Sequence, residues 1–357
     1  MKYQILANKW RPKHLDDIIG QDESIYTVKN IINSKSIHHA FLISGKHGTG
    51  KTTLARIITK CVNCKFNITI YPCNKCTCCL DIDNDSSVDS IEIDAASKTK
   101  VDEIKSVMSL SRYKNVQNRF KTYIIDECHM LSNSSFNSIL KTLEEPKFNI
   151  IYLLVTTNIE KIPLTIVSRC INLNLKKISR INIKNRILQI IKEEKFIYTT
   201  SALDKITLFS NGSMRYALNI LEKLNKTKNI TDAHVEFLFG LASDEQVLLI
   251  IKNIYEYNYP ALIINIKKII DKNRNIKNIL TQIQVVLHKI ALYKISINYD
   301  KFLSKNIIFI YLSKKLTMKK INEIYIIISQ EKLLVKNSPD DQMFLEMVMF
   351  KIINQSI

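Results

Sequence analysis

The sequence predicts an α/β fold in which helices cover a parallel sheet and helical domains follow. Short apolar runs that end at glycine or at acidic residues alternate with amphipathic stretches over residues 1–178. Such alternation is typical of βαβ units. One run leads directly into a glycine-rich loop, and beyond about residue 178 helical spacing replaces the strand pattern. A chain of 357 residues has room for two or three domains.

Local patterns predict the elements of the sheet region. A polar lead-in precedes an amphipathic helix expected from Asp22 to Ser34. TTLARIITKCV predicts the helix after the glycine-rich loop, and SFNSILKTLEE predicts another that stops before Pro146. The apolar runs predict buried strands at AFLISG (40–45), SIEID (90–94), TYIIDE (122–127) and IIYLLVTTN (150–158).

The rest of the chain has helical patterns. Polar breaks separate four amphipathic stretches, namely NIKNRILQIIKEE, SALDKITLFS, SMRYALNILEKL and TDAHVEFLF. Long Ile/Leu-rich stretches then continue to the end of the chain, although β-branched isoleucine also suits strands. We therefore expect a nucleotide-binding core over 1–178, a small helical domain over 179–240 and an all-helical domain over 241–357.

Composition restricts the class of protein. The formal net charge of +19 favours a polyanionic partner such as nucleic acid. The alternative is compositional bias, because an AT-rich genome also enriches Ile, Asn and Lys. The longest apolar runs are too short to cross a bilayer, and the opening MKYQILANKW lacks the apolar stretch of a signal peptide. We therefore expect a cytoplasmic protein with reduced thiols and no membrane partner.

The glycine-rich loop fits the phosphate-binding pattern G-x4-G-K-[ST] between a strand and a helix. Backbone N–H groups and the helix N-terminus would face the phosphates of a nucleotide. Lys51 would reach the terminal phosphates, and the Thr52 hydroxyl would bind Mg²⁺. The alternative is a chance glycine-rich loop. The residues expected to contact the nucleotide here are Gly45, Lys46, His47, Gly48, Thr49, Gly50, Lys51, Thr52 and Thr53.

Polar residues end two of the predicted strands. Asp126 would hold Mg²⁺, and the adjacent Glu127 would polarise the water that attacks the terminal phosphate. Acids at strand ends are common, but this pair follows the phosphate loop and precedes another buried strand. That strand ends in Thr156-Thr157-Asn158, which would orient the same water or serve only as a turn.

Six of the eight cysteines lie between Cys61 and Cys79. Cys64, Cys73, Cys76 and Cys79 offer four thiolates, the ligand set of a closed structural zinc site. The alternatives are core cysteines without a metal, or a redox switch. Cys61 and Cys78 are spare, so the ligand set is less certain than the metal. Cys128 and Cys170 lie in apolar surroundings and are expected to pack in the core.

These residues carry a family resemblance. The motifs are ANKWRP (7–12), IIGQ, SIHHAFLISG, the phosphate loop, the cysteine spacing, SIEIDAASKTKVDEI, DECHML, FNSILKTLEEP, TTNIEKIP and SRC (168–170). From about residue 3 to 240 the chain resembles the gamma/tau subunits of bacterial DNA polymerase III. These are the AAA+ ATPases of the sliding-clamp loader, in which a zinc module follows the phosphate-loop helix.

The resemblance implies roles for particular residues. Arg169 is similar to an arginine finger that acts on ATP held by a neighbouring subunit. Thr157 matches the first sensor, and Arg215, preceded by Met214, matches the second. The lead-in residues expected to pack around the adenine are Ala7, Trp10, Arg11, Pro12 and Ile19.

The resemblance also implies an architecture and partners. An AAA+ core with a zinc module at about 61–80 would be followed by a lid domain and a collar domain. The collar would assemble with delta, delta-prime and further gamma copies. The complex would use ATP, Mg²⁺ and Zn²⁺ to load the sliding clamp onto primed DNA, and this chain would hold no polymerase active site. The helicase- and polymerase-binding domains of tau are absent, so we expect a short gamma-like form.

Some expectations remain open. Tyr216 stands where the family usually has an acidic residue, which makes the local ion pairing uncertain. Ala96–Lys100 follows a strand and opens VDEIKSVM, so it would grip a DNA phosphate or simply cap a helix. The rival functions are a non-hydrolysing delta-prime-like subunit, which would have a degraded phosphate loop, and a branch-migration motor, which would lack the four-cysteine insert.

Overall fold

A computed structural model describes residues 5–96, 117–146, 149–225, 227–270, 275–295, 306–335 and 340–354. The chain forms two compact units. One contains Met1–Ile197 and Ile206–Asn229, and the other contains Tyr198–Lys205 and Ile230–Ile357. The three-part division expected from the sequence stays a prediction. The segment proposed to grip DNA lies outside the described residues from position 97 onward.

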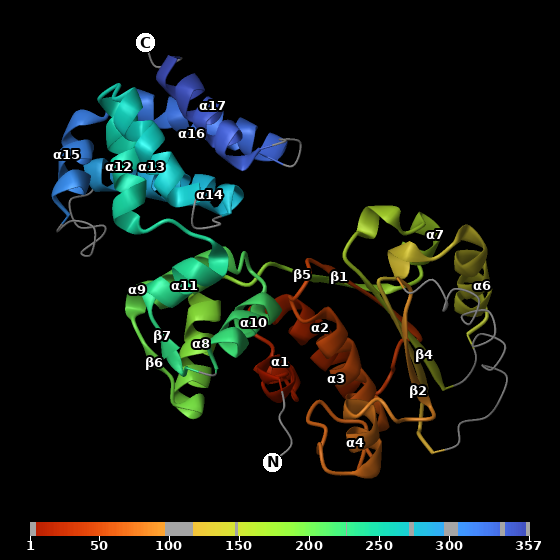
Figure 1. The fold of residues 1–357 in the computed structure, drawn as a ribbon. Helices are drawn as coiled ribbons and strands as arrows, with labels where there is room; N and C mark the ends of the chain where they lie inside the picture. Colours follow the sequence, from red (N-terminus) through yellow and green to blue (C-terminus); the bar gives the residue numbers. More distant parts are fainter. Residues whose placement is uncertain are drawn as a thin grey trace. The chain divides into compact units, whose positions relative to one another are not determined.

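A five-stranded parallel sheet forms the centre of the first unit (Figure 1). Its strands lie in the order β2-β3-β4-β1-β5. Their bounds are β1 Ala40–Gly45, β2 Ser90–Asp94, β3 Lys121–Asp126, β4 Ile150–Thr156 and β5 Ile171–Leu175. The sequence predicted the first four. It did not predict β5, an edge strand in which asparagines alternate with apolar residues.

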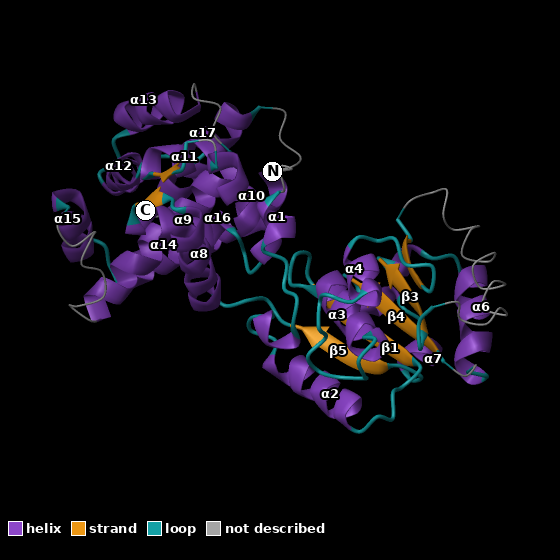
Figure 2. Ribbon diagram, turned by 90° about the horizontal axis from the view of Figure 1, so that it is seen from below, coloured by secondary structure: helices purple, strands orange, loops and turns teal. Residues whose placement is uncertain are grey.

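Helices cover both faces of the sheet (Figures 1 and 2). Phe41 and Ile43 of β1 pack on one face with residues of α2 and α3. Ala40 and Leu42 point to the other face and pack with residues of α6 and α7. The helices of this part are α1 Leu6–Lys9, η1 Leu15–Asp17, α2 Asp22–Asn33, α3 Lys51–Asn63, α4 Thr77–Asp83, η2 Cys128–Met130, α6 Asn133–Glu144, η3 Ile159–Lys161 and α7 Leu164–Val167.

Helices α8 and α10 also belong to the first unit. Apolar residues recur along both helices and are buried, among them Ile187 and Leu221. Glu222 on α10 accepts a hydrogen bond from the backbone N–H of Leu6, which ties the lead-in to this helix. The helices here are α8 Arg180–Glu194 and α10 Met214–Leu224, and the boundary between the two units passes through β6 Ile197–Tyr198, α9 Thr200–Phe209 and β7 Asn229–Ile230.

The second unit is mostly helical, as the sequence predicted. One apolar core of leucine, isoleucine and valine runs through its helices from Ala242 to Ile353. The helices are α11 Asp232–Phe239, α12 Asp244–Tyr255, α13 Tyr259–Ile270, α14 Ile276–Ile295, α15 Ile307–Lys315, α16 Met318–Leu334 and α17 Asp341–Asn354.

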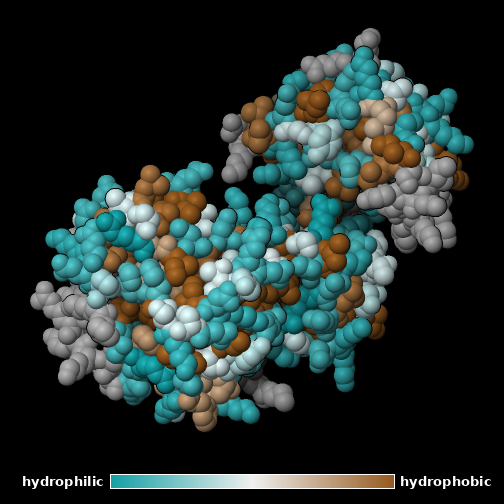
Figure 3. All heavy atoms as spheres, turned by 180° about the vertical axis from the view of Figure 1, so that it is seen from behind, coloured by the Kyte–Doolittle hydropathy of each residue, from teal (hydrophilic) through white to brown (hydrophobic). Residues whose placement is uncertain are grey.

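The surface is mixed in polarity. On the face drawn in Figure 3, hydrophilic side chains predominate and hydrophobic ones lie between them. Among the described helices, none combines the length and the apolar character needed to cross a membrane.

Candidate nucleotide-binding site and metal centre

The glycine-rich loop joins β1 to α3 at the carboxyl end of the sheet, as predicted. Gly48 has a φ of 74°, in the left-handed region. A Cβ atom at this position would lie 2.0 Å from Oγ of Ser213, so only glycine fits. The Gly48 carbonyl accepts a hydrogen bond from the backbone N–H of Met214 at 3.0 Å. The loop therefore packs closely against the N-terminus of α10.

Lys51 is a buried cation at the start of α3. Its Nζ donates a hydrogen bond to the Lys46 carbonyl at 3.1 Å. Burial lowers the pKa of Lys51, while the nearby Glu127 and Asp126 carboxylates act in the opposite direction. A partly desolvated ammonium is stabilised strongly by an additional anion, because little water screens the charges. The site is therefore suited to bind phosphate.

The predicted Mg²⁺ ligands lie together. Oγ1 of Thr52 donates a hydrogen bond to Oδ2 of Asp126 at 2.6 Å. The other Asp126 oxygen accepts from the backbone N–H of Glu127 at 2.9 Å. A hydroxyl and a carboxylate at this spacing fit the oxygen ligands that Mg²⁺ takes in nucleotide sites. The structure thus unites residues 74 positions apart in sequence.

Glu127 and Thr157 also meet, as their proposed roles require. The Thr157 hydroxyl donates to Oε2 of Glu127 at 2.9 Å, and the Thr157 backbone N–H reaches the same oxygen at 3.3 Å. Glu127 itself has a φ of 47°, which is uncommon for glutamate. The strained backbone and the threonine together hold this carboxylate at the ends of β3 and β4.

Two histidines lie beside Glu127, and the sequence analysis named only one of them, His47. Nδ1 of His129 lies 3.3 Å from Oε2 of Glu127, and Nδ1 of His47 lies 3.6 Å from Oε1. The Thr156 hydroxyl lies 3.2 Å from the same His129 nitrogen. The motif DECHML places His129 only two residues from Glu127, but spacing alone gave no reason to assign it a contact.

The phosphate loop, Asp126 and Glu127 border a cavity of about 360 Å³ within the first unit. Most of the residues predicted to bind nucleotide line it: Ala7, Trp10, Arg11, Pro12, Ile19, His47, Gly48, Thr49, Gly50, Lys51, Thr52, Thr53, Asp126, Glu127, Met214 and Arg215. Gly45, Lys46, Thr157 and Arg169 are not part of its wall. The wall also contains residues that the sequence did not indicate as contacts, namely Asn8, Asp17, Arg56, Glu92, Ile178, Arg186 and Leu218, and it contains Ile18 of the IIGQ motif.

Charged side chains form several contacts in and beside the wall of the cavity. Trp10 donates from Nε1 to Oε1 of Glu194 at 2.8 Å, and the Arg186 guanidinium lies 5.7 Å from the Trp10 ring centroid. Arg56 donates from Nε to Oε2 of Glu92 at 2.7 Å. Burial lowers the pKa of Arg11, and the like charges of Arg56 and Arg215 lower it further. The Trp10 ring is therefore held between the carboxylate of Glu194 and the guanidinium of Arg186.

Arg169 lies away from this cavity. It forms an ion pair with Oε1 of Glu144 at 2.9 Å and donates to the Thr165 carbonyl at 2.8 Å. Both side chains are partly exposed. The alternative to an arginine finger is a structural arginine that pairs with a nearby acid, and the ion pair with Glu144 matches it. Arg169 is not part of the cavity wall of its own chain. Its action on ATP held by a neighbouring subunit stays a prediction.

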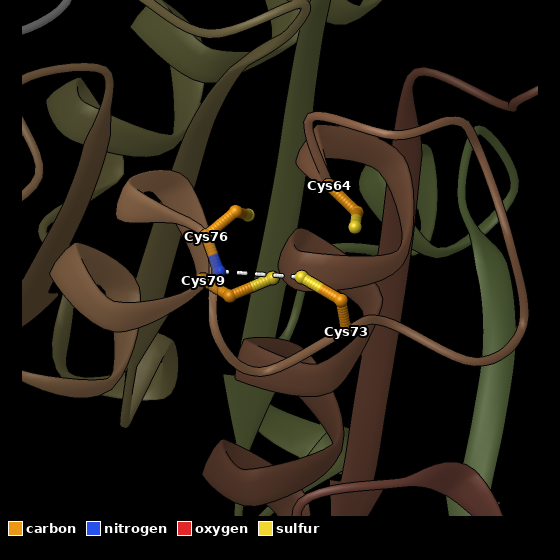
Figure 4. Close-up of side chains that lie close together, drawn as sticks. All are labelled: Cys64, Cys73, Cys76 and Cys79. Atoms are coloured by element: carbon orange, nitrogen blue, oxygen red, sulfur yellow. Dashed lines mark hydrogen bonds between the residues drawn. The ribbon is translucent and has the colours of Figure 1, made fainter.

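Four cysteine sulfurs converge beside α3 (Figure 4). The ligand atoms of Cys64, Cys73, Cys76 and Cys79 all lie within 4.8 Å of one another. Sulfurs at the corners of a tetrahedron around Zn²⁺ lie about 3.8 Å apart when each Zn–S bond is about 2.3 Å. Four soft thiol donors at this spacing therefore fit zinc closely.

The turn between these cysteines has the form of a metal-binding knuckle. The Lys75 and Cys76 N–H groups donate to Sγ of Cys73 at 3.5 and 3.3 Å. The Lys75 bond, followed by bonds from Cys76 and Cys64, lowers the pKa of the Cys73 thiol to about 6 against the opposing effect of burial. A thiolate is the form that binds metal. The hydrogen bonds of the turn thus favour the thiolate form of Cys73, the form that would bind zinc.

The spare cysteines lie outside this cluster. Burial raises the pKa of Cys61 to about 12, and its sulfur lies 3.9 Å from the Ile70 carbonyl. Burial also raises the pKa of Cys78. Cys128 and Cys170 are buried in the core against the sheet, as predicted. Among the described residues, the geometry therefore selects the four cysteines that the spacing indicated.

Comparisons with known proteins agree with this geometry. A family model described as DNA polymerase III, delta subunit, matches residues 20–179. A second, described as DNA polymerase III subunits gamma and tau domain III, matches residues 230–357. DNA polymerase III subunit gamma of Buchnera aphidicola subsp. Baizongia pistaciae is 39% identical, covering 99% of this chain and 98% of that protein.

Longer relatives match over part of their length. DNA polymerase III subunit tau/gamma of Haemophilus influenzae is 34% identical, covering 98% of this chain and 51% of that protein. Among solved structures, the Thermotoga maritima RuvB Holliday junction branch migration motor has a TM-score of 0.48 and 21% identity, covering 71% of this chain and 80% of that one. This structural likeness supports no functional inference. The near-complete sequence matches show that the chain belongs to the family of DNA polymerase III gamma and tau subunits.

Proposed function

We propose that this chain binds ATP with Mg²⁺ in the cavity of the first unit and hydrolyses it. The observation that carries the proposal is the convergence of Lys51, the Thr52–Asp126 pair and the Glu127–Thr157 pair at one end of the sheet. Lys51 would bind the terminal phosphates, and Thr52 and Asp126 would hold the metal ion. Mg²⁺ would neutralise charge that develops on the transferred phosphoryl group.

Glu127 would then orient and polarise the attacking water. Its carboxylate is held by the Thr157 hydroxyl at 2.9 Å, so the first-sensor role of Thr157 would be to fix Glu127 in place. Arg215 lines the same cavity beside Gly48 and would contact the phosphates from α10. Trp10, Pro12 and Ile19 would surround the adenine.

We further propose that ATP turnover drives loading of a sliding clamp onto primed DNA in the cytoplasm. Family membership supports this activity, as do the residues that a hydrolytic subunit requires. Partners would be delta, delta-prime and further copies of the chain, joined through the helices of the second unit as a collar. The basic net charge of +19 suits contact with a DNA backbone. Lys98 and Lys100 remain the proposed phosphate contacts.

A non-hydrolysing structural subunit is the alternative. Such a subunit has no need for Lys51, Thr52, Asp126 and Glu127 in one cavity. The presence of all four therefore favours hydrolysis. The direct test compares ATP turnover by the assembled wild-type chain with that of the Lys51→Ala variant.

We expect one Zn²⁺ per chain, bound by Cys64, Cys73, Cys76 and Cys79. Four thiolate ligands leave no open position, so the metal would stabilise the fold by on the order of 10 kcal/mol and take no part in hydrolysis. Metal analysis and X-ray absorption of reduced protein should give one zinc with Zn–S distances of about 2.3 Å.

Two serine variants sharpen this prediction. Cys79→Ser removes a ligand and should lower zinc content and thermal stability together. Cys78→Ser is the matched control, because Cys78 is the adjacent thiol and lies outside the cluster. Zinc-free wild-type protein, or full zinc content in Cys79→Ser, would contradict the assignment.

A further inference from the structure

The side chain of Asn74 links the cysteine cluster to two other parts of the first unit. Asn74 lies in the turn between Cys73 and Cys76 and has a φ of 53°. Its Oδ1 accepts a hydrogen bond from Nζ of Lys60 at 2.9 Å, and its Nδ2 lies 3.1 Å from Nε2 of His14. An ammonium only donates, so the amide oxygen must face Lys60. The amide nitrogen then donates to His14.

Lys60 connects the turn to the phosphate-loop helix. It lies on α3, the helix that starts with Lys51 at the phosphate loop. Lys60 is only 1% exposed and also pairs with Oδ1 of Asp83 on α4 at 2.9 Å. A buried lysine is costly unless its hydrogen bonds are made. The Asn74 oxygen therefore supplies a hydrogen-bond acceptor to the buried Lys60 ammonium and links the turn to α3.

His14 connects the turn to the wall of the nucleotide cavity. Its backbone N–H donates to Oδ2 of Asp17 at 3.1 Å, and η1 begins at the next residue. Arg11, Pro12 and Asp17, on either side of His14, all line the cavity.

We propose that Asn74 is a positioning residue that couples metal binding by the cysteine cluster to nucleotide affinity. Metal bound to Cys73 and Cys76 would fix the left-handed turn and so hold the Asn74 amide. The amide would fix His14, and His14 would hold residues 11–17 in place as a wall of the cavity. The inference rests on the proposed nucleotide site. It gives the zinc module a role in binding beyond local stability.

The test measures ATP affinity through the fluorescence of Trp10, the single tryptophan of the chain, which lines the cavity. Asn74→Gly removes the amide and keeps a residue that tolerates the turn. His14→Phe removes the accepting nitrogen at a position outside the cysteine cluster. Each variant should weaken ATP binding about two- to tenfold, the value of one hydrogen bond, while zinc content stays at that of the wild type.

Matched variants separate positioning from general damage. Lys75→Ala changes the exposed neighbour of Asn74 in the same turn and should bind ATP like the wild type. His14→Gln restores an acceptor and should recover most of the affinity. The Asn74→Gly/His14→Phe double variant should bind little worse than Asn74→Gly alone, because both changes break the same Asn74–His14 contact and Asn74→Gly also removes an acceptor of Lys60.

Removing zinc tests whether metal binding at the cysteine cluster affects ATP affinity. A chelator should weaken ATP binding by the wild type and have a smaller effect on His14→Phe. An equal effect on both proteins, or wild-type affinity in His14→Phe and Asn74→Gly, would overturn the coupling. Lys51→Ala in the same titration tests the site itself: if it binds ATP normally, the nucleotide site is wrong, and if it alone fails, only the role of Asn74 is wrong.

Discussion

Lys51→Ala abolishes ATP-dependent activity while the protein remains folded and keeps its zinc. Lys51 supplies a point charge to the terminal phosphates, and its Nζ donates a hydrogen bond to the Lys46 carbonyl of the same loop. Its charge is poorly hydrated in the cavity, where burial lowers the pKa of Lys51. Removing it therefore leaves phosphate without its main partner and relieves a desolvation cost in the empty protein.

The measurement is ATP binding by fluorescence together with phosphate release. Circular dichroism, thermal unfolding and zinc content should match or slightly exceed those of the wild type. Lys46→Ala is the matched control and should bind ATP like the wild type, because Lys46 lies outside the cavity wall and the backbone carbonyl that accepts from Lys51 is kept. Normal ATP binding and hydrolysis by Lys51→Ala would show that the loop does not hold the nucleotide phosphates.

Arg169→Ala binds ATP almost normally yet fails to hydrolyse it in the assembled complex. Arg169 is absent from the wall of its own cavity and is partly exposed. A guanidinium donated by a neighbouring subunit would present a planar fork to the γ-phosphate and stabilise developing charge. Arginine fingers are worth about 10³–10⁵ in rate, so a loss of this size is expected in phosphate release.

Glu144 offers the control that separates this role from a structural one. In this structure Arg169 pairs with Glu144 at 2.9 Å. If the pair only supports the fold, Glu144→Gln and Arg169→Ala should lower stability and hydrolysis alike. If Arg169 acts on a neighbour, Glu144→Gln should keep most of the activity, since an exposed ion pair contributes little to stability.

Mixed assemblies test whether Arg169 acts in trans. A subunit with Lys51→Ala cannot bind ATP but still carries Arg169. Mixed with Arg169→Ala subunits, it should restore hydrolysis at the intact nucleotide site of its neighbour. Absence of such complementation, in assemblies that form normally, would exclude action in trans.

Local patterns sufficed to predict the phosphate loop and the cysteine cluster. Both depend on fixed spacing along a short segment of chain. The phosphate loop spans Gly45–Thr52, so its functional residues are close in sequence as well as in space. The buried strands β1, β3 and β4 were equally clear, because both of their faces are apolar. Strand β5 was missed because asparagine alternates with its apolar residues, as suits an edge strand.

Contacts between distant residues were not predictable from spacing. Trp10 and Glu194 lie 184 residues apart, and His14 and Asn74 lie 60 apart. Nothing in the periodicity of either segment identifies its partner. The Arg56–Glu92 pair was missed for the same reason, although a glutamate inside an otherwise apolar strand such as SIEID signals a buried partner.

Phosphate release by the purified wild-type assembly, with sliding clamp and primed DNA, tests the central claim most directly. An assembly containing Lys51→Ala, prepared in the same way, measures any contaminating ATPase. The account predicts ATP hydrolysis by the wild type that clamp and primed DNA stimulate, with only background in the variant. Equal phosphate release by the two assemblies, or none above background in the wild type, would contradict it.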